Sequence, residues 1–97
     1  MVLVLCILSG PRTEGAYTAR ELARAAVAKG NTVRVFLAGD GTAHAESMAA
    51  LRDLGVQVVG CSADAAVRGI DRPGSPGRGS FVDLGEMTSD ADRVLVF

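Results

Sequence analysis

Apolar residues in this chain fall into short, nearly continuous runs separated by stretches with helical spacing. The runs cover residues 2–8, 32–38 and 56–59, and a further one covers residues 93–97. An apolar run of this length predicts a strand buried on both faces, as in a parallel sheet covered by helices. We therefore expect these runs to be strands, with the first of them inside the sheet.

The segment between the first two runs predicts a helix that begins at Thr13 or Glu14. Gly30 is placed as its C-cap. Its apolar residues share one helical face, and they are Ala16, Ala19, Leu22, Ala23, Ala26 and Val27.

A second helix is expected between the second and third runs. Thr42 is placed as its N-cap and Gly55 as its end. The residues expected to face the sheet are Met48, Leu51 and Leu54.

A third helix is expected over residues 81–89, with Ser80 as its N-cap. Thr88 is a further candidate cap, for the segment that comes after it. Gly85 weakens this helix by about 1 kcal/mol relative to alanine. Its inward residues are expected to be Phe81, Leu84 and Met87.

Strands that alternate with helices through short turns predict right-handed βαβ units and a parallel sheet. The expected fold is therefore α/β: a three-layer α/β/α arrangement with four to five parallel strands and flavodoxin-like layering. All 97 residues fit one domain. Residues 71–79 (D-R-P-G-S-P-G-R-G) contain no apolar side chain and are expected to form a mobile loop.

Composition excludes several classes of protein. The net charge is −1 and no basic run occurs, so nothing indicates a nucleic-acid partner. No apolar stretch is long enough to span a membrane, and residues 2–8 lack the basic leader of a signal peptide. Two cysteines placed far apart are not a disulfide framework, so we expect a cytoplasmic protein with reduced thiols. An alanine-rich core without tryptophan is thin, so we also expect an oligomer.

The two cysteines differ in their expected surroundings. Cys6 lies inside the first strand and is expected to be a core side chain. Cys61 follows the third strand and precedes an alanine-rich helix start. Ligands of open parallel sheets collect at that edge, and helix N-terminal N–H groups favour a thiolate over a thiol. A reactive cysteine and a buried structural one are both open at this position.

Neighbours of Cys61 bear on its chemistry. The first free amides of the helix would belong to Ser62, Ala63 and Asp64. The Asp64 carboxylate would oppose ionisation if it faced the sulfur. Arg68 lies two helical turns further on, where it is either an activating cation or a scaffold residue.

Two further candidates lie after the first two strands. The turn at Gly10 can hold a small anion or be a plain turn, since S-G-P-R-T-E-G matches no nucleotide-binding motif. His44 stands near Asp40 across a glycine turn. His44 could be a solvated residue, a metal ligand or a partner of Cys61. The metal ligand is the weakest of these hypotheses, because the sequence has one histidine and no second ligand motif.

The segment V-x-V-x-x-C-x(6)-R-G-I, ending at Ile70, resembles the cysteine motif of the DsrE/TusD sulfur-relay family (DsrE/DsrF/TusD-like proteins). The start V-L-V-L-C-I-L-S-G-P, the segment V-R-V-F-L-A-G-D-G-T and the ending S-D-A-D-R-V-L-V-F resemble the same family in the same order. Many relatives carry a second cysteine where Asp64 stands, and a fourth strand where residues before Ser80 are rich in proline and glycine.

This resemblance implies a sulfur carrier or sulfurtransferase subunit that holds a persulfide on Cys61 and passes sulfur to a partner thiol. It implies sulfur donor and acceptor proteins as partners, a trimer or hexamer, a C-terminal strand beside the first strand, and no metal or organic cofactor. Two alternatives remain: a non-catalytic oligomeric relative that binds a partner or small ligand, and an unrelated small-molecule enzyme that uses His44 and Asp40.

Overall fold

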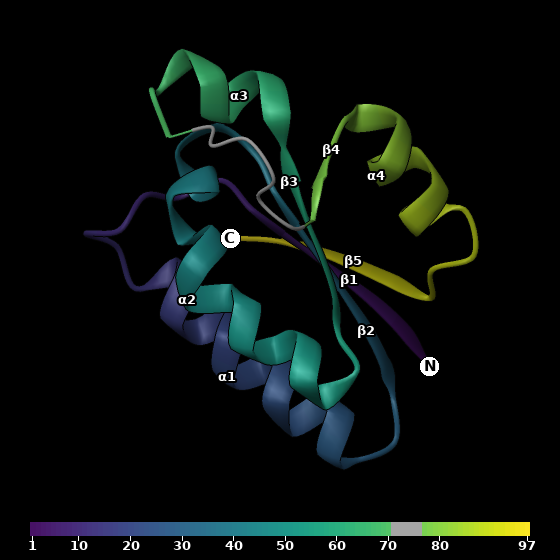
Figure 1. Ribbon diagram of the computed structural model, residues 1–97. Coiled ribbons are helices and arrows are strands. Elements are labelled where there is room, and N and C mark those ends of the chain that lie inside the picture. Colours follow the sequence, from purple (N-terminus) through teal and green to yellow (C-terminus); the bar gives the residue numbers. More distant parts are fainter. Residues whose placement is uncertain (71–76) are drawn as a thin grey trace.

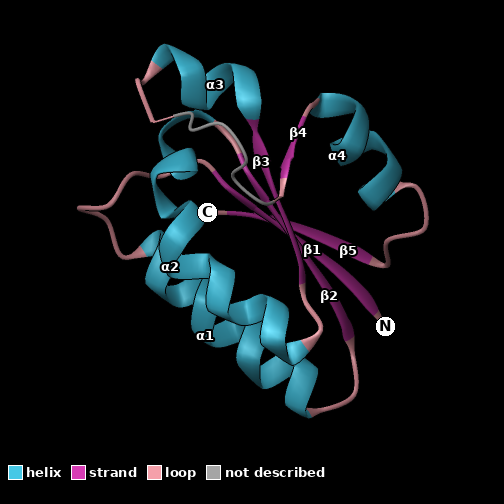
Figure 2. Ribbon diagram, viewed as in Figure 1, coloured by secondary structure: helices cyan, strands magenta, loops and turns pink. Residues whose placement is uncertain are grey.

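A computed structural model describes residues 1–70 and 77–97, and it forms an α/β fold. The strands are β1 (Val2–Ile7), β2 (Thr32–Leu37), β3 (Gln57–Cys61), β4 (Arg78–Gly79) and β5 (Arg93–Val96). The helices are α1 (Gly15–Ala28), α2 (Ala45–Ala49), α3 (Ser62–Val67) and α4 (Phe81–Thr88), and two 3-10 helices, η1 (Gly39–His44) and η2 (Ala50–Leu54), flank α2. Figures 1 and 2 show helices on both sides of a twisted sheet, which confirms the expected three-layer arrangement.

The five strands are parallel and lie in the order β4-β3-β2-β1-β5. β1 lies between β2 and β5, so the first strand is internal and the C-terminal strand is its neighbour, as expected. The fourth strand is present as the two residues of β4, which pair with the end of β3. The loop expected at 71–79 falls mainly on residues 71–76, which lie outside the described part of the chain.

Side chains of successive strand residues point to opposite faces, and each face has its own core. The face covered by α1 and α2 carries Leu5, Val35 and Val58 among its buried residues. The opposite face, covered by α4, carries Val4, Phe36 and other buried residues, and both cysteines belong to it. Burial raises the pKa of the Cys6 thiol, so Cys6 is a neutral core side chain as expected.

The first helix forms as its apolar spacing predicts. It begins at Gly15, directly after Glu14, and its alanines at positions 16, 19, 23 and 26 are buried against the sheet. Gly30 lies one residue beyond the C-cap, Lys29, in a left-handed conformation that glycine adopts without cost.

The second helix differs from the expectation. Thr42 does not cap it, because Thr42 lies inside η1 and its hydroxyl donates a hydrogen bond to the Gly39 carbonyl at 2.8 Å. Met48 and Leu51 are buried as predicted, but Leu54 is 47% exposed because the tightening of the last turn into η2 rotates it off the apolar face. Gly55 ends the segment in a left-handed conformation.

Two other expectations need correction. β3 continues through Gly60 to Cys61 instead of ending at residue 59, because the Gly60 N–H donates to the Gly77 carbonyl and the strand gains a partner in β4. Phe81 is 58% exposed, although its ring packs 5.6 Å from that of Phe36.

The short α4 begins at Ser80, whose side chain accepts from Val82 while Asp83 accepts from the Ser80 N–H. This reciprocal capping box explains why so short a helix starts there. Thr88 is the last residue of α4 and caps nothing after it.

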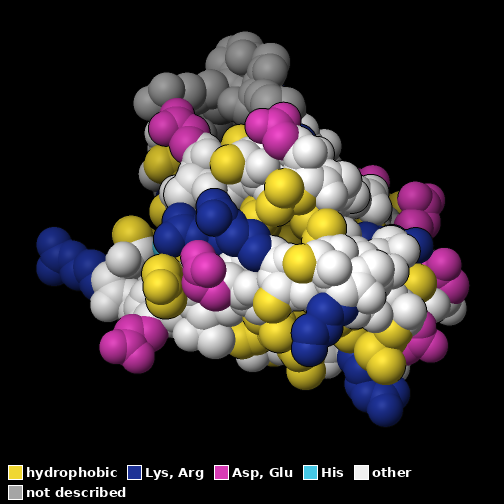
Figure 3. Space-filling model, turned by 90° about the horizontal axis from the view of Figure 1, so that it is seen from below, with side chains coloured by type: hydrophobic (Ala, Val, Ile, Leu, Met, Phe, Trp, Pro, Cys, Tyr) yellow, Lys and Arg dark blue, Asp and Glu magenta, His cyan; other side chains and the backbone are white. Residues whose placement is uncertain are grey.

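Charged side chains of both signs are interspersed on the face of the molecule in Figure 3. No helix in the described ranges is long and apolar enough to cross a membrane.

Candidate functional site

The candidate residues gather at the carboxyl ends of β1, β2 and β3, where loops and the short α3 close the sheet edge. Figure 1 shows α3 beyond the end of β3, away from the layers formed by α1, α2 and α4. Gly10 follows β1, Asp40 and His44 lie in η1 after β2, and Cys61 ends β3. Because parallel strands end at the same edge, residues far apart in sequence meet here.

Cys61 is both the last residue of β3 and the N-cap of α3, whereas the sequence pattern placed it after the strand and directly before a helix. Its side chain is 2% exposed and packs with the core on the α4 side, which includes Phe36, Val59 and Met87. Its sulfur makes no capping hydrogen bond within the part of the chain that the structure describes. The expectation of an accessible thiol contacted by helix N–H groups is therefore not met in this structure.

Asp64 ties α3 to the turn after β2. Its Oδ2 accepts a hydrogen bond from the Gly39 backbone N–H at 2.7 Å. The carboxylate that stands where many relatives have a second cysteine thus has a structural partner of its own. Gly39 has φ +54°, a conformation that leaves its N–H pointing toward this acceptor at no steric cost.

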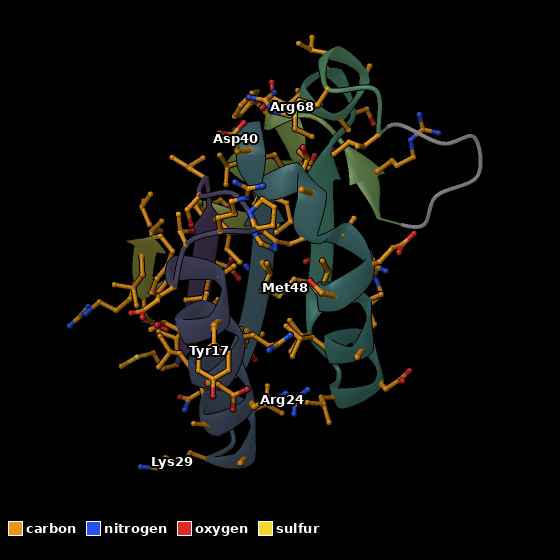
Figure 4. The ribbon with its side chains drawn as sticks, turned by 90° about the vertical axis from the view of Figure 1, so that its left-hand side faces the viewer. Tyr17, Arg24, Lys29, Asp40, Met48 and Arg68 are labelled. Carbon is orange, nitrogen blue, oxygen red and sulfur yellow. The ribbon has the colours of Figure 1, made fainter. Side chains whose placement is uncertain are left out.

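Arg68 makes the second tie between the same two segments. Its Nε donates to Asp40 Oδ1 at 2.9 Å, and its Nη1 donates to the Asp64 carbonyl at 3.1 Å. Figure 4 shows Arg68 and Asp40 side by side above the two long helices. Arg68 therefore acts in this structure as a scaffold residue that holds the end of α3.

His44 is 8% exposed and its Nε2 lies 2.9 Å from the Ser9 carbonyl oxygen. Because a carbonyl oxygen only accepts, Nε2 carries the proton of this hydrogen bond. The prediction of a solvated His44 is wrong, since the ring is buried between the ends of β1 and β2. Its recorded partner is Ser9, whereas Asp40 pairs with Arg68. In residues 1–70 and 77–97, no group of three or more His, Cys, Asp and Glu side chains is arranged to hold a metal ion.

The candidate residues line three different pockets. Gly10, Asp40 and Arg68 line an open pocket of about 400 Å³. Cys61 and Ser62 line a smaller one of about 50 Å³. His44 lines a third, of about 170 Å³, between α1 and α2. The sequence placed these residues at one edge, and the structure distributes them around three separate hollows.

The small pocket also contains residues that the sequence analysis did not single out. Arg52 and Arg78 both line it, and Arg52 Nη2 donates to the Val58 carbonyl at 2.8 Å. The pocket is lined by Val58 and Gly60, which belong to the face opposite the Cys61 side chain. The sequence signal that could have pointed to Arg52 is its position directly after Leu51, a residue predicted to face the sheet.

Comparisons with known proteins agree with this fold. The crystal structure of the ychN protein from E. coli has a TM-score of 0.81 to this chain at 23% identity, over 99% of this chain and 97% of that one. At this identity the likeness shows the fold alone. A comparison with curated proteins found no match. The model of the DsrE/DsrF-like family matches residues 1–97, and the chain belongs to that family.

Proposed function

We propose that this protein is a sulfur carrier of a sulfur relay, with Cys61 as the residue that holds the transferred sulfur. The family to which the chain belongs is generally associated with sulfur relay. The observation that carries the proposal is the position of Cys61 at the junction of β3 and α3, on the edge where parallel sheets place their chemistry. The other cysteine, Cys6, lies inside β1 with a raised pKa and is unsuited to the task.

The transfer consists of two thiol exchanges without net oxidation. The Cys61 thiolate attacks the outer sulfur of a donor persulfide, a new S–S bond forms, and the donor leaves as a thiolate. A thiolate on the acceptor protein then attacks the outer sulfur on Cys61, and the Cys61 thiolate is released. Neither step needs a metal or an organic cofactor.

Access to the sulfur requires Cys61 to leave its packing with Phe36 and Met87, because its side chain is 2% exposed. Cys61 is the N-cap of α3, so it moves when that helix loosens. α3 is short, and none of its six residues is buried. Two bonds hold this helix to the turn after β2: the Gly39 N–H donates to Asp64, and Arg68 at the C-cap of α3 donates to Asp40. A short exposed helix held by few polar contacts belongs to the low-stability end of a protein, so local opening exposes the thiol at modest cost.

The experiment is to incubate the protein with a sulfane-sulfur donor and to measure intact mass. One added sulfur atom is expected in wild type and in Cys6→Ser, and its loss is expected in Cys61→Ser. A mass gain that persists in Cys61→Ser, or no gain in wild type, would refute the carrier role.

Alkylation tests the opening step separately. Removing the ties in Asp64→Ala and Arg68→Ala should speed alkylation of Cys61 severalfold while Cys6 remains slow, because the helix that begins directly after Cys61 is loosened. Arg24→Ala, on the exposed side of α1, is the matched control. Equal rates in all variants would show that α3 does not gate the thiol.

A second candidate is a non-catalytic family member that binds a partner or small ligand. The 2% exposure of Cys61 and the structural partner of Asp64 favour it. A wild-type protein that takes up no sulfur and whose Cys61 resists alkylation in every variant would support this alternative.

We further propose that the chain is cytoplasmic and forms a homo-oligomer, a trimer or hexamer, that works with sulfur donor and acceptor proteins. Support for the oligomer comes from exposed apolar side chains. Val96 of β5 is 64% exposed, and Val82 of α4 is also exposed. An uncovered apolar surface of this kind marks an interaction site. Light scattering coupled to size-exclusion chromatography tests it, with Val96→Asp expected to lower the mass; a monomeric wild type would refute it.

A further inference from the structure

The pocket between the start of α1 and α2 has chemistry that the proposed sulfur transfer does not use. Its polar side chains are Thr13, Tyr17, Arg20, His44 and Ser47. Buried Ala16 and Met48 also line it, and the small side chain of Ala16 leaves room beside them. Figure 4 shows Tyr17 on α1 and Met48 between the two helices.

The pocket lies at the carboxyl ends of the neighbouring strands β1 and β2, between the segments that follow these two strands. In open parallel sheets, ligands bind outside the carboxyl ends of the strands. The loop that leaves β1 and the first turn of α1 both contribute residues to this pocket, through Thr13 and Tyr17.

His44 lines this pocket with its ring held in place. The residue is 8% exposed, and its Nε2 donates a hydrogen bond to the Ser9 carbonyl at 2.9 Å. With the proton on Nε2, Nδ1 is the ring nitrogen that can accept a hydrogen bond from a ligand.

Arg20 adds positive charge with unused donor capacity. Its Nε is buried and has no hydrogen-bond partner in residues 1–70 and 77–97. The nearest carboxylate, that of Glu21, is 3.8 Å away, which is too long for a hydrogen bond. The guanidinium lies 5.5 Å from the centre of the Tyr17 ring, which fixes its position beside the pocket.

The start of α1 also favours a negatively charged ligand. The helix has 14 residues, its N-cap Glu14 makes no side-chain capping bond, and its first turn contains no acidic residue. First-turn N–H groups have no intrahelical partner, and the helix end carries a partial positive charge. The side chains of Arg20, Tyr17 and His44 thus line one hollow beside the start of α1.

We propose that this pocket binds a small tetrahedral oxyanion of the phosphate or sulfate type. A volume of about 170 Å³ is below the ~300–1,000 Å³ of pockets for drug-sized ligands, so the ligand is a free small anion. Arg20 supplies the charge, Tyr17 supplies a hydroxyl donor, and His44 Nδ1 accepts from a protonated oxygen of the anion. The Thr13 hydroxyl already donates to the Gly10 carbonyl at 2.8 Å and only lines the pocket.

The test is a titration of the full-length protein with inorganic phosphate, at constant ionic strength, followed by ¹H–¹⁵N NMR. Saturable shifts are expected at the amides of Ala16 and Tyr17 and at the His44 ring nitrogens. Arg20→Gln should weaken binding by about tenfold. Arg24→Gln, one turn further along α1 in Figure 4, should leave it within about twofold.

Tyr17→Phe is a second variant that keeps the ring and the exposed surface, and it should weaken binding severalfold through loss of one hydroxyl. Shifts that do not saturate, or equal weakening in Arg20→Gln and Arg24→Gln, would show diffuse charge attraction and overturn the site. The outcome is independent of Cys61, since Cys61→Ser should bind phosphate as wild type does.

Discussion

Asp64 accepts a hydrogen bond from the backbone N–H of Gly39, and this bond joins the helix after the third strand to the turn after the second. The bond measures 2.7 Å and links residues that are far apart in sequence. A cysteine in place of Asp64 lacks the carboxylate that makes this bond. The residue at this position therefore sets how firmly α3, which begins directly after Cys61, is held to the turn after β2.

Replacing Asp64 by alanine should destabilise the protein by about 1–3 kcal/mol, because a partly buried N–H loses its charged acceptor. Urea unfolding followed by circular dichroism measures this. Asp53→Ala is the control, since Asp53 is exposed and should change stability by less than about 0.5 kcal/mol. Equal losses in both variants would mean that the Asp64 bond contributes nothing specific.

The turn after β2 depends on a glycine for space. A Cβ at Gly41 would overlap the carbonyl oxygen of Ile7, which is a backbone atom and cannot rotate away. Gly41→Ala should therefore cost more than about 2 kcal/mol of unfolding free energy. Thermal or urea unfolding measures the loss.

Gly85 is the matched contrast to Gly41. It lies inside α4, and a Cβ there would meet nothing within 4 Å. Gly85→Ala should stabilise the protein by about 0.5–1 kcal/mol, because alanine is the better helix former. A destabilised Gly85→Ala, or a neutral Gly41→Ala, would contradict the packing described around these two glycines.

Most of the sheet could be predicted from the sequence because buried parallel strands require apolar residues at nearly every position. β1 and β2 follow the apolar runs closely, and α1 follows the spacing of its alanines. These signals are local: each depends on residues within one element, so an apolar pattern is enough to find them.

The details of the candidate site were not predictable in the same way. Cys61 is buried because Met87 of α4 and Phe36 of β2 pack on its face of the sheet, and neither is near it in sequence. The break of the second helix into η1, α2 and η2 accompanies the close approach of Gly41 to Ile7. Both features arise from contacts between elements, which spacing within one element does not encode.

Stability should fall as the pH rises through the ionisation of Cys6. Burial raises the pKa of this thiol above its ordinary value of 9.0, so the unfolded chain loses its proton first. The free energy of unfolding that the neutral thiol contributes is thus fully present below pH 9.0. It is lost as the pH rises through the raised pKa of the Cys6 thiol in the folded protein.

Urea unfolding below and above pH 9.0 measures this dependence. Cys6→Ala is less stable at every pH because of the lost volume, but its stability should decline less steeply with pH. An identical pH dependence in the two proteins would show that Cys6 ionises equally in the folded and unfolded chains.

Arg34 and Asp90 give a pH dependence of the opposite sign. The Arg34 side chain donates to the Asp90 carboxylate and, at 2.7 Å, to the Met87 carbonyl, so it joins β2 to the end of α4. The hydrogen bond from Arg34 holds the pKa of Asp90 below its ordinary value of 3.8. The stability that this carboxylate contributes is present above pH 3.8 and is lost as the pH falls through the lowered pKa.

Carboxyl-carbon NMR titration measures the pKa of Asp90 directly. Arg34→Met keeps the length of the side chain, removes its donors and should return the pKa of Asp90 towards 3.8. Arg93→Met removes a cation from β5 and should leave the pKa of Asp90 unchanged, because Arg93 donates to the Asp92 carbonyl instead. If the pKa of Asp90 moves equally in both variants, the shift comes from net charge. A response confined to Arg34→Met assigns the shift to the hydrogen bond from Arg34, which ties the end of α4 to the sheet face on which both cysteines lie.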